Sequence, residues 1–196
     1  MSAQNFTEFS LLDPFETPLP PIPTDVFMID IETLGLVSGS AILEIAAAEF
    51  DPATGEVLRE WEGRIDLLDS IRLGLSVDAE TAAFHLRKGY SGSLRGSSNH
   101  RVLSGLDEFL HARSEDVSVW AWGKDFEAKH FECVLGRLGF GPMWDFRKLH
   151  CARDQWIFAF GQDKPRPRRH TALQDVRDQI ADLHAALTSH RDCAAS

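Results

Sequence analysis

Acidic side chains stand in three separate segments of the sequence, each at a point where a strand or a helix is expected to begin or end. Asp30 and Glu32 follow apolar residues, and two positions apart on a strand their side chains leave the same face, with Cα atoms about 7 Å apart. Asp125 opens a later helical segment, and Asp175 comes shortly after His170. Carboxylates are the ligands that Mg2+ prefers, and a histidine can take a proton from water. Together these residues have the chemistry for metal-assisted phosphodiester hydrolysis.

Each of these residues also has a purely structural interpretation. Two acids at a strand end can be solvated, and Asp125 can cap the free N–H groups of the helix that it opens. His170 and Asp175 can simply stabilise the start of a helix. Asp30, however, follows a run of apolar residues, where an unpaired carboxylate is costly to desolvate. That context favours the metal-binding interpretation.

The hydrophobic pattern predicts a mixed sheet covered by helices. The segment 26–31 is β-branched and aromatic, as in a strand buried on both faces. The segment 41–50 contains an alanine run that suits either a helix or a strand, but the turn residues at 51–55 favour a hairpin. The other strands are expected at 57–65 and 117–122, and helices at 79–86, 103–110, 126–138, 147–159 and 172–187. This order of elements is typical of an α/β protein.

Composition limits the classes of function. The chain has 196 residues, of which 43% are apolar, enough for one packed domain or a tight pair of domains. Proline-rich sequence predicts an extended arm at residues 1–24. The net charge of −10 argues against a basic surface that coats nucleic acid, although not against a local, metal-assisted phosphate site. Because the sequence shows neither a secretory signal nor a membrane-length apolar run, we expect a cytoplasmic protein.

Three motifs together resemble those of the DEDDh, or DnaQ-like, superfamily of 3′–5′ exonucleases. They are Asp30-Ile31-Glu32-Thr33, Trp120-Ala121-Trp122-Gly123-Lys124-Asp125-Phe126 and His170-Thr171-Ala172-Leu173-Gln174-Asp175. The resemblance runs from about Val26 to Leu187, and the segment 41–55 looks closest to the group near exodeoxyribonuclease VIII and RNase AS. It implies an RNase H-like fold, a mixed five-stranded sheet flanked by helices, in an exonuclease domain at residues 25–190.

The resemblance also implies a role for each motif residue. Asp30 would bridge two Mg2+ or Mn2+ ions, and Glu32 and Asp175 would complete the coordination of one of them. Asp125 would assist the other ion, often through water. His170 would be the general base, since an imidazole with a pKa near 6.5 accepts a proton at neutral pH.

Two further sets of residues are candidate substrate contacts. Thr33 and Leu34 match positions at which the family contacts the terminal nucleotide. Four cations directly precede His170 on a segment that also contains prolines: Lys164, Arg166, Arg168 and Arg169. A solvated charge run is the alternative interpretation. Because charges act over a screening distance of about 8 Å, the place of these cations beside the expected site favours contact with the phosphate backbone.

The leading hypothesis is a metal-dependent 3′–5′ exonuclease that acts on the 3′ end of single-stranded DNA or RNA and releases nucleoside 5′-monophosphates. One alternative is a catalytically silent, exonuclease-like module that binds nucleic acid or a protein. Another is a phosphohydrolase that acts on small phosphate esters. A homodimer is a further expectation, since related enzymes often pair. DNA and RNA remain equally open, because recognition of the 2′-OH depends on the shape of the pocket.

Overall fold

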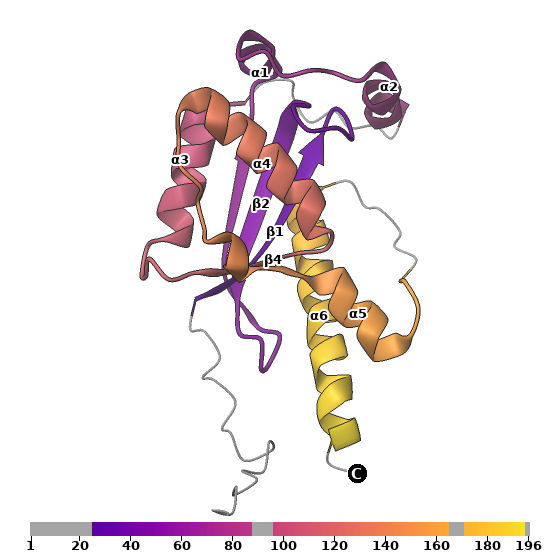
Figure 1. Ribbon diagram of the computed structural model, residues 1–196. Helices are drawn as coiled ribbons and strands as arrows, with labels where there is room; N and C mark the ends of the chain where they lie inside the picture. The colour runs from indigo at the N-terminus through magenta and orange to yellow at the C-terminus, as the bar shows by residue number, and fades with distance from the viewer. Residues whose placement is uncertain (1–24, 88–95, 165–170, 195–196) are drawn as a thin grey trace, which may run out of the picture.

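The computed structural model describes residues 25–87, 96–164 and 171–194, and these form a mixed five-stranded sheet covered by helices (Figure 1). The strands are β1 (Val26–Thr33), β2 (Ile42–Phe50), β3 (Val57–Arg64), β4 (Ser118–Ala121) and β5 (Leu149–Cys151). Their order across the sheet is β3-β2-β1-β4-β5. β1, β2 and β3 pair antiparallel, whereas β1, β4 and β5 pair parallel. The expected sheet is thus confirmed, while the arm expected at residues 1–24 lies outside the described residues.

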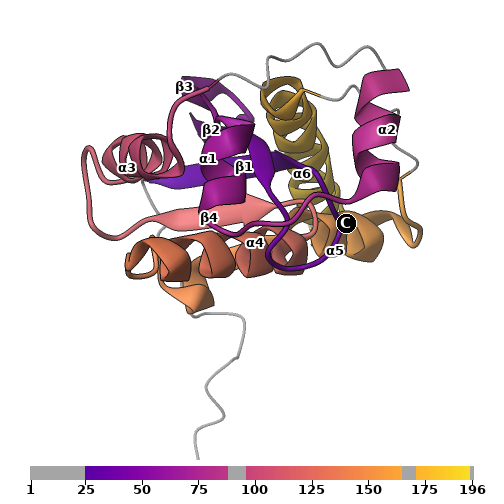
Figure 2. The ribbon, with the colours of Figure 1, turned by 90° about the horizontal axis from the view of Figure 1, so that it is seen from above.

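Helices cover both faces of the sheet and one of its ends. In the described part of the chain they are α1 (Leu67–Arg72), α2 (Ala79–Arg87), α3 (Asn99–Leu110), α4 (Lys124–Leu138), the 3-10 helix η1 (Phe146–Lys148), α5 (Ala152–Phe160) and α6 (Ala172–Ala194). α3 and α4 share one core with the sheet, and α6 shares a second core on the opposite face. α1 and α2 lie beyond the end of the sheet toward which the β1 arrow points (Figure 1), and in the view from above α1 is drawn in front of the strands (Figure 2).

The central strand β1 directs alternate side chains to the two cores. Phe27, Ile29 and Ile31 pack in the core with α3 and α4, whereas Val26 and Met28 pack with α6. Asp30 and Glu32 are the next even-numbered residues of the strand, so their side chains project from the same face, the one that α6 covers. The strand pattern therefore brings both acids to the place where the core under α6 ends.

The alanine-containing segment forms a strand. All nine residues of β2 are buried, and among them Ala46 and Ala48 pack beneath α6. Small side chains at these two positions let the helix approach the sheet closely. The expected hairpin to β3 is confirmed, and Gly55 in its turn has a φ of +74°, a conformation that glycine adopts readily.

The region 147–159, expected to be a single helix, is different. η1 and β5 occupy its first residues, and α5 begins only at Ala152. β5 pairs in parallel with β4 from Leu149 to Cys151, and three residues are too few to show a strand period in sequence. In addition, α6 continues past residue 187 to Ala194. None of the helices within the described residues is both long and apolar enough to cross a bilayer.

Candidate active site

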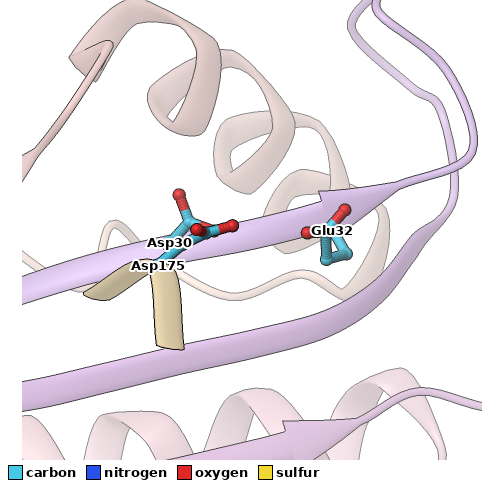
Figure 3. Close-up of side chains that lie close together, drawn as sticks. All are labelled: Asp30, Glu32 and Asp175. Carbon is cyan, nitrogen blue, oxygen red and sulfur yellow. The ribbon is translucent and has the colours of Figure 1, made fainter. Parts of the chain in front are cut away.

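Three carboxylates from the two ends of the described chain meet at the edge of the core under α6. Asp30, Glu32 and Asp175 each bring one oxygen to within 4.8 Å of the others (Figure 3). The first two project from β1, and Asp175 projects from the first turn of α6. All three side chains are half-buried. Oxygens around one Mg2+, each about 2.1 Å from it, lie up to about 4 Å apart, so the three carboxylates are close to a coordinating arrangement.

The position of Asp175 depends on β2. Glu44 of β2 is buried and lies opposite Glu32 in the antiparallel register. Its Oε1 accepts the backbone N–H of Ala172, the first residue of α6, at 3.1 Å. A carboxylate at this place satisfies a free N–H and interacts favourably with the positive end of the helix dipole. A charged side chain of the sheet thereby holds the helix end that carries Asp175.

Asp30 lies in an environment that opposes its negative charge. Burial raises the pKa of Asp30 well above its usual value, and repulsion from Glu127, Glu32 and Asp175 raises it further. A hydrogen bond from Gln179 Nε2 to Asp30 Oδ1, at 2.7 Å, acts in the opposite direction. A divalent cation would stabilise the charged form of such a carboxylate. The residues present therefore fit a metal site.

The first turn of α4 holds two acids in very different surroundings. Asp125 is exposed, and it is not the N-cap, because the cap position belongs to Gly123. Glu127 is only 4% exposed, and its Oε2 has no hydrogen-bond partner among the described residues. Burial raises the pKa of Glu127 to about 8. Neither acid belongs to the group within 4.8 Å, but Glu127 is the carboxylate that most strongly repels Asp30.

Sequence reasoning missed Glu127, although the helical pattern contains a signal for it. Glu127 lies on the buried stripe of α4 together with Phe131 and Val134, at the spacing i, i+4, i+7. An acid on an apolar stripe is costly unless a cation or a donor compensates it. That position distinguishes Glu127 from Asp125, which falls on the exposed face.

The two residues proposed to contact the terminal nucleotide both lie at the end of β1. Thr33 is buried, and its Oγ1 donates a hydrogen bond to Gly35 O at 2.8 Å. Leu34 is buried in the core with α3 and α4. The exposed apolar side chains of this loop are instead Leu36 and Val37, which are 69% and 65% exposed. Substrate contact by Thr33 and Leu34 stays a prediction.

Only the first cation of the basic segment falls in the described part of the chain. Lys164 Nζ forms an ion pair with Asp182 of α6 and lies 4.8 Å from the ring centre of Trp156. The other residues of the segment, and the expected base, lie outside the described residues: Arg166, Arg168, Arg169 and His170. Their roles stay predictions.

The comparison with protein families shows to which family this chain belongs. A model of the 3′–5′ exoribonuclease Rv2179c-like domain matches residues 25–187. The chain belongs to this family. It is thus a 3′–5′ exonuclease, a hydrolase, as its motifs predict. No curated protein sequence matches it.

Solved structures similar to this Rv2179c-like domain confirm the RNase H-like fold and the likeness to the DEDDh group. The nuclease domain of 3′hExo, a DEDDh family member bound to rAMP, has a TM-score of 0.56 at 14% identity, over 83% of this chain and 91% of that one. Exonuclease I from Methylocaldum szegediense has a TM-score of 0.62 at 16% identity, and the E. coli enzyme in complex with a 5cy-dA13 oligonucleotide has 0.60 at 14%. Each of these two matches covers 81% of this chain but 39% of the exonuclease I chain.

Proposed function

We propose that this exonuclease uses two Mg2+ or Mn2+ ions to hydrolyse the 3′ end of single-stranded RNA and release nucleoside 5′-monophosphates. The convergence of Asp30, Glu32 and Asp175 is the observation that carries the metal dependence. The exoribonuclease description of the matching family favours RNA over DNA. The same carboxylate cluster argues against a silent binding module, which has no need to keep such repelling groups together.

The roles of the carboxylates follow from their positions. Asp30, on the same strand face as Glu32 and near Asp175 of α6, would be a ligand of both ions, and Glu32 and Asp175 would complete one site. For the fourth carboxylate we favour Glu127 over Asp125, because Glu127 is buried and acts directly on Asp30. When bound, the ions would stabilise negative charge on the phosphate and on the leaving 3′ oxygen.

The protein's own residues would supply the remaining steps. His170 immediately precedes the helix start that carries Asp175, and its imidazole would take the proton of the attacking water. Gln179 would hold the Asp30 carboxylate in one orientation through its hydrogen bond. Thr33 and Leu34 would contact the terminal nucleotide, and the cations Lys164, Arg166, Arg168 and Arg169 would contact the phosphate backbone.

Matched RNA and DNA single strands, labelled at either end and incubated with Mg2+ or Mn2+, test this function. We expect stepwise loss of mononucleotides from the 3′ end, faster on RNA. The Asp30→Asn variant should fold but lose cleavage. Purely internal cuts, or full activity in Asp30→Asn, would reject the proposal, whereas faster cleavage of DNA would reject only the preference for RNA. A comparison with small phosphate esters tests the phosphohydrolase alternative.

A further inference from the structure

The end of β1 next to Glu32 is irregular and is held from outside the sheet. Glu32 pairs with Glu44 but Thr33 pairs with Ile42, so the register shifts between these two residues of β1 and Leu43 of β2 is the extra residue. Bulges of this kind often occur beside active sites, where they redirect side chains. The direction of the Glu32 carboxylate therefore depends on what fixes the backbone at Thr33.

The side chain of His85 contacts the backbone at this point. His85 is 5% exposed and is the one buried residue of α2, all of which the structure describes. Its Nε2 lies 3.0 Å from Thr33 O and 4.0 Å from Glu32 Oε2. A carbonyl oxygen can only accept, so Nε2 carries the hydrogen and donates it to Thr33. α2 thus reaches the site through the buried side chain of His85.

We propose that His85 is a positioning residue for the metal site: by donating to Thr33 O, it holds the β1 backbone opposite the bulge so that Glu32 faces Asp30 and Asp175. The ring also lies beside the Glu32 carboxylate and limits its movement away from the other two acids. The inference rests on the proposed metal site. The competing interpretation is that His85 merely docks α2, in which case its loss would lower stability and leave metal binding unchanged.

Four variants separate these roles. His85→Leu removes the donor, whereas His85→Gln keeps an N–H donor at a similar reach, and His85→Asn is polar but too short to reach Thr33 O. Leu86→Gln is the matched control, because Leu86 is the next residue of α2 and is 74% exposed. For each variant we would measure the Kd for Mn2+ by calorimetry, the Tm without metal, and kcat and KM on a single-stranded oligonucleotide.

We expect His85→Leu and His85→Asn to bind Mn2+ about 10- to 100-fold more weakly, the usual effect of losing an outer-shell partner, with a matching loss in kcat. His85→Gln should recover most of both, and Leu86→Gln should match the wild type. If His85→Leu does not fold, the comparison of Asn with Gln decides. Two results would overturn the role of His85 but not the metal site. One is Mn2+ binding at wild-type strength in folded His85→Leu or His85→Asn, and the other is a His85→Gln variant that binds Mn2+ no more tightly than His85→Asn. Absence of Mn2+ binding to the wild type would overturn the metal site and the inference together.

Discussion

Asp125 and Glu127 stand in the same turn of α4, yet one is exposed and the other buried. If Glu127 contributes to the metal site, Glu127→Gln should lower kcat by about 100-fold or more, in the range seen when one catalytic group is removed. Asp125→Asn should have the smaller effect, because its carboxylate lies in solvent. Steady-state kinetics on a 3′-labelled oligonucleotide in Mn2+ measures both. A larger loss of kcat in Asp125→Asn than in Glu127→Gln would instead indicate that Asp125 is the fourth carboxylate of the metal site.

The raised pKa of Glu127 makes the stability of the metal-free protein depend on pH. In the unfolded chain the carboxyl group loses its proton near pH 4.5, but in the folded protein only near pH 8, so the folded state binds more protons in between. The free energy of unfolding should therefore fall as pH rises across this interval, by up to about 1.4 kcal/mol per pH unit from this group. Urea denaturation in EDTA measures the slope.

Two variants test whether Glu127 causes this pH dependence of the free energy of unfolding. Glu127→Gln should flatten the pH dependence, although Asp30 will keep a part of it because its pKa is also raised. Asp125→Asn, in the same helical turn but exposed, should retain the wild-type slope. Equal slopes in Glu127→Gln and the wild type would contradict the assignment of a buried, protonated Glu127.

At the scale of elements, the contact between β2 and α6 can be tested at Glu44. Glu44→Met removes the acceptor of the Ala172 N–H, which should lower the free energy of unfolding by about 1 to 2 kcal/mol. It should also weaken Mn2+ binding, because the first turn of α6 carries Asp175. Glu44→Gln keeps an acceptor oxygen and should lose less in both. Urea unfolding and Mn2+ calorimetry provide the measurements, and identical behaviour of Met and Gln would show that the hydrogen bond is unimportant.

The elements predicted correctly from sequence are those with a clear period or a strong turn. The strand at Val26, the hairpin around Gly55 and the helix ended by Gly139 are of this kind. α1 and β5 were missed because six and three residues are too short to show a period. The motif residues of β1 could be predicted because they continue a strand with a clear apolar pattern. Glu127 could not, because its role depends on which face of α4 is buried. His85 gave no signal, because its role comes from a backbone irregularity that no residue pattern encodes.

At the scale of the whole molecule, an acidic protein must bind a polyanion. With a net charge of −10, attraction has to be local, and the predicted source is the basic segment. Replacing Arg166, Arg168 and Arg169 with Gln should make the slope of log kcat/KM against log salt concentration less steep by about 2. Each phosphate contact on a single strand contributes roughly 0.7 to this slope. A titration with KCl checks this.

A matched control and a substrate control complete that experiment. Arg147→Gln removes an exposed cation that is paired with Asp145 and lies on η1, and it should leave the salt dependence unchanged. Hydrolysis of a mononucleotide ester should be affected little by the triple variant, because such a substrate has no upstream phosphates. An unchanged salt slope in the triple variant would mean that these arginines do not contact the backbone.

The carboxylate cluster joins the first strand of the described chain to its last helix. Ribosomes add residues from the N-terminus at about 5 to 20 per second, so β1 emerges well before α6. Asp175 can join Asp30 and Glu32 only after the last helix has left the exit tunnel and docked on the sheet. The complete cluster therefore forms only when α6 docks on the sheet, later than the folding of β1 with its neighbouring strands can begin.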